Sequence, residues 1–225
     1  MKKALLLFLL LCILPLGGCG EAREINDTAI ISGAAFDLDK ETGAWKVTAQ
    51  VVNREAEPGT QAPPLILDAT GVSAKEALAN LEFKSSRKIL LSHARVFILS
   101  KEAAEAGISP LIDLILKNNS LRLSTELLVA DTETAAQVWE LKTDATDFIG
   151  FDLDDMIHEA REWGNVPGLK AYQAKTILET EDMDPLIPLI GKDERGNAAI
   201  IGAAVFLGDK MVGRITKEET EGSCK

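Results

Sequence analysis

Among the residues of this chain, Cys19 has the sequence context that most clearly predicts a chemical modification. It closes the segment Leu16-Gly17-Gly18-Cys19, in which small residues lead up to a thiol. This segment resembles a bacterial lipobox, where the cysteine thiol receives diacylglycerol and the peptide bond before the cysteine is cut. We therefore expect Cys19 to carry S-diacylglycerol and N-acyl groups, and Leu16, Gly17 and Gly18 to form the recognition sequence. Two or more acyl chains on one residue give stable membrane attachment.

The residues before this segment have the parts of an export signal. A positively charged start precedes residues 4–14, which form an unbroken run of eleven apolar residues. Such a run is shorter than the roughly 20 residues that a membrane-spanning helix needs, so a lipoprotein signal peptide over residues 1–18 is favoured over a retained span. Residues 19–24 would then be the lipidated tether. The alternative is an ordinary secretory signal that leaves Cys19 as a free thiol.

Composition narrows the chemistry further. The 225 residues carry 24 basic and 35 acidic side chains, a formal net charge of −11, and loss of residues 1–18 would leave −13. This charge has the wrong sign for binding phosphates, which excludes nucleic acid as a partner. Two histidines and three cysteines are too few for a metal centre with several histidine or thiolate ligands. Once Cys12 leaves with the signal and Cys19 is acylated, Cys224 has no cysteine partner.

Three polar side chains on one expected helix could face a cation. Asp154, His158 and Glu162 are spaced four residues apart, and this spacing places side chains on one helix face. That face lies away from the apolar stripe of the helix, so we favour a solvated polar face over a metal site. His93 lies at the start of an expected apolar strand and is interpreted as a structural histidine.

A second acidic pattern has the spacing of the first ligands of a calcium loop. Asp37, Asp39 and Glu41 alternate with other residues. However, Thr42 occupies the position where the loop needs glycine, and Thr48 stands where a bidentate glutamate is required. We therefore interpret these residues as the solvated turn of a hairpin.

The sequence has no nucleophile elbow, phosphate-binding glycine loop, dinucleotide fingerprint or zinc-protease helix motif. We therefore expect a non-catalytic protein without a cofactor, whose role is binding or assembly. The alternative is a cell-envelope lipoprotein that acts as a solute-binding protein or hydrolase, which would need a cleft lined by aromatic side chains or paired carboxylates. With 5% aromatic residues, a cleft that stacks sugars is disfavoured.

Two segments near the N-terminus predict a β-hairpin. Residues 25–38 are rich in Ile, Ala and Thr, and residues 45–51 alternate apolar and polar side chains, the period of a half-buried strand. The polar turn between them contains Gly43, which can take a positive φ. A short strand over residues 65–69 follows, and Ser73 can cap a helix. The apolar face of that helix comprises Ala74, Ala77, Leu78 and Leu81.

The middle of the chain predicts a central strand, two helices and a further strand. Residues 88–100 contain near-continuous apolar runs, typical of a strand covered on both faces. Residues 101–106 predict one helix, and Pro110 lies in the first turn of the next. The second helix should bury Leu111, Ile112, Ile115 and Leu116. An alternating strand is expected over residues 121–129, and Thr132 is expected to cap a helix carrying Ala135, Val138 and Trp139.

The last part of the chain predicts a helical hairpin over residues 145–180 and a β-hairpin formed by residues 198–207 and 211–215. Because one hairpin alone is not a stable domain, it either pairs with the first sheet or begins a second domain that the chain does not finish. The expected fold class is α+β, a mixed β-sheet with flanking helices. We expect this N-terminal domain over residues 25–142, a helical connector over residues 143–190 and the start of an incomplete second domain over residues 191–225.

Several stretches spread along the chain together resemble the Ger(x)C family, the C-subunit lipoproteins of bacterial spore germinant receptors. Residues 18–19, 23–27 and 29–33 resemble the lipobox and first strand of the family, and residues 45–52 resemble its second strand. Four further stretches resemble the core of the family, namely residues 92–99, 101–104, 110–113 and 127–130. Three stretches near the end of the chain resemble its second-domain hairpin, namely residues 202–206, 213–215 and 219–222.

The resemblance implies a non-catalytic subunit that its lipid anchor holds on the outer face of the spore inner membrane. There it would work beside two multi-spanning subunits, A and B, in nutrient sensing and the triggering of germination. No motif fixes a germinant site, so direct germinant binding stays open. Residues Arg23, Glu24, Asn26 and Asp27 are a candidate membrane-proximal contact surface, with a solvated lead-in to the first strand as the alternative. Family members continue past the position of Gly222, so a C-terminally truncated chain is expected.

Overall fold

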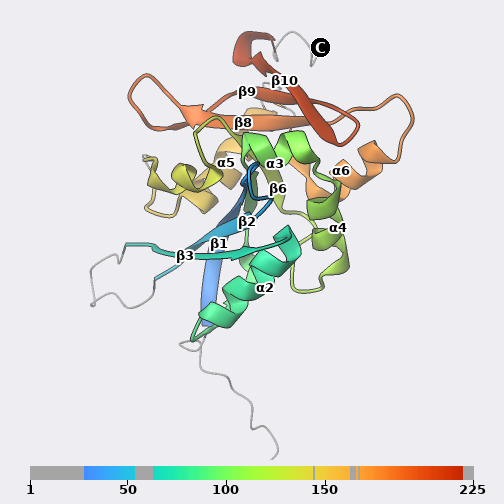
Figure 1. Ribbon diagram of the computed structural model, residues 1–225. Coiled ribbons are helices and arrows are strands. Elements are labelled where there is room, and N and C mark those ends of the chain that lie inside the picture. The colour runs from blue at the N-terminus through green and yellow to red at the C-terminus, as the bar shows by residue number, and fades with distance from the viewer. Residues whose placement is uncertain (1–27, 54–62, 144, 163–165, 167, 220–225) are drawn as a thin grey trace, which may run out of the picture.

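The computed structural model describes residues 28–53, 63–143, 145–162, 166 and 168–219 (Figure 1). Its strands are β1 (Thr28–Leu38), β2 (Trp45–Val51), β3 (Leu65–Gly71), β4 (Lys88–Leu90), β5 (Val96–Leu99), β6 (Glu126–Ala130), β7 (Leu169–Lys170), β8 (Leu186–Lys192), β9 (Ala198–Leu207) and β10 (Lys210–Thr216). Its helices are α2 (Ala74–Lys84), α3 (Lys101–Ala106), α4 (Ser109–Lys117), α5 (Ile149–Glu162) and α6 (Ala171–Leu178), with short 3₁₀ helices η3 (Leu91–His93) and η4 (Ala135–Glu140). The predicted α+β class is confirmed.

One mixed sheet of ten strands runs through the described residues. Its path is β10-β9-β8-β6-β5-β1-β2-β3, with β4 paired to β1 and β7 paired to β6. The neighbours β1, β5, β6 and β8 are parallel in the centre, whereas β1–β2–β3 and β8–β9–β10 are antiparallel. The parallel centre is buried on both faces because the helices of the crossover connections cover it.

The first hairpin and the helix after it form as the sequence predicts. β1 and β2 pair from Leu38 opposite Trp45 onward, and Gly43 in the turn has a φ of 70°. Ser73 is the N-cap of α2, and its hydroxyl accepts a hydrogen bond from the backbone N–H of Glu76. The buried residues of α2 are those of the predicted face, Ala74, Ala77, Leu78 and Leu81.

The single central strand expected over residues 88–100 is wrong in one respect, because the structure divides it into β4, η3 and β5. β4 pairs with the beginning of β1, and β5 pairs with its later part from Gly33 onward. Between these two parts the register of β1 shifts, and the backbone N–H of Arg95 donates to the carbonyl of Ser32. The 3₁₀ helix η3 therefore carries the chain from the pairing of β4 with β1 to the shifted pairing of β5 with β1.

Two further local expectations also need correction. β6 begins only at Glu126, and all five of its residues are buried instead of alternating, while Leu123 is 48% exposed before it. Thr132 does not cap the helix that follows, which is the 3₁₀ helix η4. Its first N–H groups, those of Ala135 and Ala136, instead donate to the carboxylate of Asp37 at 2.6 and 3.2 Å. The capping group thus comes from β1, which sequence spacing could not reveal.

The core has two layers, one on each face of the sheet. One cluster unites the sheet with α2, α3, α4 and α6 and includes Phe36, Phe97 and Phe206. The other lies beneath η4 and α5 and includes Trp139 and Leu153. In these layers the described helices bury one apolar face each and leave the opposite face to the surface.

The C-terminal hairpin joins the first sheet, which was one of the two alternatives for it. β8 pairs in parallel with β6 through Val129 opposite Leu189 and Ala130 opposite Ile190. β9 and β10 then continue the sheet as antiparallel neighbours. The sheet therefore runs across the boundaries expected at residues 142 and 190.

Small residues let α5 approach β1 very closely. Ser32 and Gln50 are buried, and the Ser32 hydroxyl donates to the Gln50 side-chain oxygen at 2.7 Å. The same oxygen accepts the backbone N–H of Gly150 at 3.1 Å. A Cβ at Gly150 would lie only 2.7 Å from the backbone carbon of Ser32. Only glycine fits at this contact.

Gly150→Ala should therefore destabilise the protein by about 1–3 kcal/mol, because the added methyl group forces α5 away from β1. Alanine is the better helix former, so a net loss would report the close contact and not helix propensity. The matched control is Gly213→Ala, where an added Cβ meets no atom within 4 Å. Denaturant unfolding of both variants would measure the difference, and equal stability of the two would contradict this packing argument.

Candidate functional site

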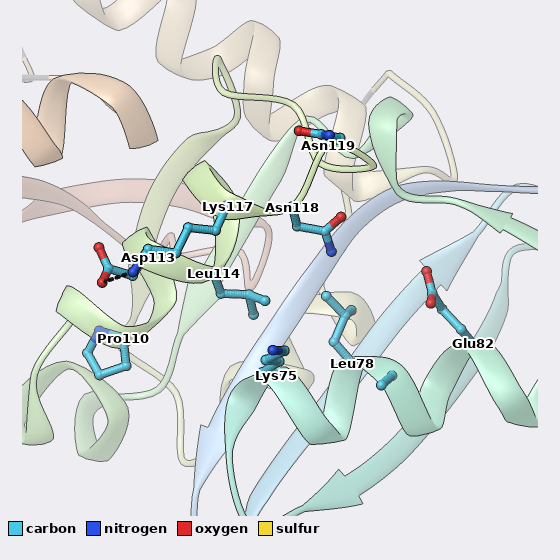
Figure 2. Close-up of a pocket in the computed structure, with 10 residues that line it drawn as sticks. Lys75, Leu78, Glu82, Pro110, Asp113, Leu114, Lys117, Asn118 and Asn119 are labelled. Atoms are coloured by element: carbon cyan, nitrogen blue, oxygen red, sulfur yellow. Dashed lines mark hydrogen bonds and ion pairs between the residues drawn. The ribbon is translucent and has the colours of Figure 1, made fainter.

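A groove of about 490 Å³ between α2 and α4 is the best candidate for a functional site (Figure 2). The helices contribute side chains from two sides, and the two asparagines after α4 close one end. The lining residues are Lys75, Leu78, Ala79, Glu82, Pro110, Asp113, Leu114, Lys117, Asn118 and Asn119.

Local sequence fixes the two helices that form this groove. α2 is capped by Ser73, and α4 has a proline in its first turn, where the missing N–H costs nothing. Each helix buries one apolar face in the same core layer, so their remaining side chains meet along the groove. Leu78 and Leu114 give the groove an apolar floor between charged groups (Figure 2).

Ion pairs fix the charge on the α4 side of the groove. The Lys117 ammonium donates to the Asp113 carboxylate at 2.8 Å, and Lys175 of α6 lies 3.5 Å from the other carboxylate oxygen. The hydrogen bond from Lys117 lowers the pKa of Asp113 below its ordinary value. Asp113 is therefore ionised at neutral pH, and the α4 side presents both signs of charge.

The chemistry of this lining suits binding. None of the ten lining residues in the described part of the chain is a serine, threonine, cysteine, histidine or tyrosine. An apolar floor with a few polar groups is typical of a site that holds a small molecule or a side chain of a partner.

A buried ion pair holds α5 and β7 against β6. The Glu126 carboxylate, 4% exposed, accepts both its hydrogen bonds from one Arg161 nitrogen at 2.9 Å, and the Lys170 ammonium lies 3.8 Å away. Burial raises the pKa of Glu126 above its ordinary value of 4.5 despite these two cations. This group connects three elements and lies outside the groove.

The predicted polar face of α5 is solvated at His158 and Glu162 but not at Asp154, which is partly buried. Asp154 faces Arg95 at 3.4 Å, whereas His158 and Glu162 form an exposed pair 3.5 Å apart. His93 is exposed at the end of η3, so the interpretation as a structural strand histidine is wrong. The described residues contain no group of three histidine, cysteine, aspartate or glutamate side chains that could hold a metal ion.

The residues of the calcium-like pattern also have separate structural roles. The Asp39 carboxylate accepts the backbone N–H groups of Glu41 and Thr42 at 2.8 and 3.1 Å, which closes the hairpin turn. Asp37 points instead to the start of η4. The hairpin-turn interpretation therefore agrees with the structure for Asp39 and Glu41 and is wrong for Asp37, which belongs to β1.

The remaining predicted site residues lie outside the described part of the chain. They are Leu16, Gly17, Gly18, Cys19, Arg23, Glu24, Asn26 and Asp27. Among the helices that the structure describes, none has the length and apolar composition to cross a bilayer.

Sequence reasoning did not single out the groove. Asp113 and Lys117 have helical spacing, but that pattern is typical of any exposed helix face. The groove exists because α2 and α4 pack on the same layer, and no local signal places them side by side.

Comparison with known proteins gives a consistent family assignment. A family model described as spore germination protein N-terminal domain matches residues 21–192. Spore germination protein KC of Bacillus subtilis is 23% identical over 87% of this chain and 51% of its own length. Spore germination protein GerQC of Bacillus cereus is 23% identical over 96% of this chain and 59% of its own length. Spore germination protein YndF of Bacillus subtilis is 24% identical over 99% of this chain and 62% of its own length.

The chain thus spans about half to three fifths of the length of these curated relatives. No solved structure shows significant similarity to it.

One buried and two partly buried carboxyls give the protein an expected pH dependence. Burial raises the pKa of Asp37, Glu126 and Asp154 above their ordinary values. A carboxyl with a raised pKa binds protons more readily in the folded state, so its contribution to stability grows as the pH falls toward its ordinary pKa. The thermal midpoint should therefore rise as the pH is lowered from neutral toward about pH 5.

Calorimetry across this pH range would measure the effect. Asp37→Asn should flatten the profile, because it removes one of the three titrating groups and keeps an acceptor for the η4 N–H groups. A midpoint that falls steadily with acidification would contradict the prediction.

Proposed function

Because the chain belongs to the Ger(x)C family of spore germination proteins, we propose that it is a lipid-anchored, non-catalytic subunit of a spore germinant receptor. The observation that carries the proposal is the family match, which extends over residues 21–192. The relatives that match nearly the whole chain bear the names of spore germination proteins. In this role the subunit takes part in nutrient sensing and the triggering of germination.

The proposed place of action is the outer face of the spore inner membrane. Cys19 would carry the diacylglycerol and acyl groups, and residues 1–18 would be removed. The partners would be the multi-spanning A and B subunits of the receptor. Arg23, Glu24, Asn26 and Asp27, which follow the lipidated cysteine, are the proposed membrane-proximal contact surface.

Support for a non-catalytic role comes from how the buried polar groups are used. Glu126 is bonded to Arg161, Asp37 caps η4, and Asp152 accepts hydrogen bonds from Thr143 and Thr146. Each of these carboxylates joins two segments of the fold. A carboxylate engaged in this way supports the structure and is poorly placed to transfer protons to a substrate.

Cys19→Ala should abolish acylation and release the protein from membranes, because the acyl chains supply most of the proposed membrane affinity. Intact-mass analysis and membrane fractionation of sporulating cells would measure both effects, and nutrient-triggered germination should be impaired in the variant. Cys224→Ala is the matched control and should keep the lipid mass and the membrane location. An unmodified, soluble wild-type protein would overturn the lipid-anchor part of the proposal.

The groove between α2 and α4 is the place where such a subunit would contact a small nutrient directly. A mixture of free amino acids and simple sugars should then raise the thermal midpoint by about 5–10 °C at about 100 times the dissociation constant. Lys75→Ala and Glu82→Ala, which change the α2 side of the groove, should each reduce this rise. Lys192→Ala, at the exposed end of β8, serves as the control. A midpoint that no nutrient moves would assign the role in sensing to partner assembly alone.

A further inference from the structure

The end of α2 and the turn that follows it combine an exposed aromatic side chain with several cations. Phe83 is 88% exposed, although α2 buries a complete apolar face elsewhere on its surface. Lys84, Arg87 and Lys88 follow within five residues. We refer to these four residues as the basic turn.

The core does not account for Phe83. The residues that α2 buries are Ala74, Ala77, Leu78 and Leu81, and Phe83 is not among them. It is also more exposed than Leu65, Ile66 or any other large apolar side chain in the described residues. An aromatic side chain in this position contributes little to folding and is free to contact another surface.

The charge of the basic turn is opposite to that of the chain. The formal net charge is −11, yet the sequence from Phe83 to Lys101 contains no acidic residue. The Lys84 ammonium donates to the backbone carbonyl of Asp68 at 2.9 Å, and a neutral acceptor leaves its positive charge in place. The Asp68 carboxylate itself faces Lys46 at 3.9 Å. Lys84 and Lys88 therefore place two exposed cations on this part of an acidic protein, beside the single carboxylate of Glu82.

The basic turn lies at the end of the molecule where β1 begins (Figure 1). β4 runs parallel to the start of β1, and Lys88 stands directly opposite Thr28. Thr28 is nine residues from Cys19 along the sequence. Nine residues can span at most about 30 Å, so a lipid on Cys19 would keep the basic turn close to the bilayer.

An aromatic side chain beside several cations is typical of a surface that contacts a membrane. Aromatic rings are enriched at the interface between lipid headgroups and water. Lysine and arginine are drawn to the negative surface potential of anionic phospholipids. The acyl anchor would raise the local concentration of lipid around the turn, so even a weak contact would be populated.

We propose that the basic turn binds an anionic phospholipid bilayer, with Phe83 at the headgroup level and Lys84 and Lys88 against the lipid phosphates. This contact gives the anchored domain one orientation on the membrane. The proposal rests on the anchoring of Cys19 proposed above, and it concerns a surface separate from residues 23–27.

The test places a fluorescent probe at two exposed positions of the same helix region. Phe83→Cys and Val72→Cys, each with Cys224→Ser, are labelled with an environment-sensitive dye in membranes that hold the acylated protein. Val72 is the matched control because it is 81% exposed and precedes the opposite end of α2. The probe at residue 83 should be quenched by spin-labelled lipid at least about threefold more strongly than the probe at residue 72. Equal quenching at the two positions would overturn the proposal.

A second measurement separates failure of the anchor from failure of the basic turn. If the protein is recovered soluble with unmodified Cys19, it is mixed with vesicles of phosphatidylglycerol and phosphatidylcholine, or of phosphatidylcholine alone. Binding to the anionic vesicles should fall about 25-fold in the double variant Lys84→Gln, Lys88→Gln, since each cation near the surface contributes about fivefold.

The control for this measurement is the double variant Lys192→Gln, Lys210→Gln, which removes the same charge from exposed positions of β8 and β10. The control should bind like the wild type. Equal losses in the two double variants, or no preference for anionic vesicles, would show that the basic turn is not a lipid-binding surface.

Discussion

The close approach of α5 and η4 to β1 is the contact on which the rest of the structure depends. β1 lies between β2 on one side and β4 and β5 on the other, and Gly33, Ala34 and Ala35 lie at its buried centre. A Cβ at Gly33 would be 2.9 Å from the Trp139 ring, whose N–H donates to the carbonyl of Thr48 at 3.0 Å. Only small residues on β1 allow the second layer to close, and that layer covers the parallel centre of the sheet.

Local signals in the sequence predict the elements whose causes are local. The first hairpin follows from alternation and a glycine turn, and α2 follows from Ser73 and one apolar face. The break in residues 88–100 could not be predicted, because it follows from a register shift in β1. The cap of η4 was missed for the same reason, since Asp37 lies 98 residues away from Ala135. The spacing of neighbouring residues does not predict contacts between residues that are far apart in the sequence.

The same division applies to the functional residues. The prediction for Cys19 rests on a short linear segment, Leu16-Gly17-Gly18-Cys19, and so depends on no fold. The groove between α2 and α4 requires two helices to pack on one layer, and none of its charged residues has a distinctive spacing. Phe83 lies outside the predicted apolar face of α2, and its exposure in the folded chain shows that the core does not use it.

The two ends of the molecule carry different kinds of surface side chains, so each end can contact a different partner. The start of β1 and the basic turn lie at one end, whereas β9 and β10 lie at the other (Figure 1). β10 is an edge strand of the sheet, and Leu207 and Val212 beside its turn are 67% and 62% exposed. Edge strands and exposed apolar side chains are surfaces where another polypeptide can add. With the basic turn on the bilayer, this edge faces away from the lipid, so lipid contact and protein contact use separate surfaces and need not compete.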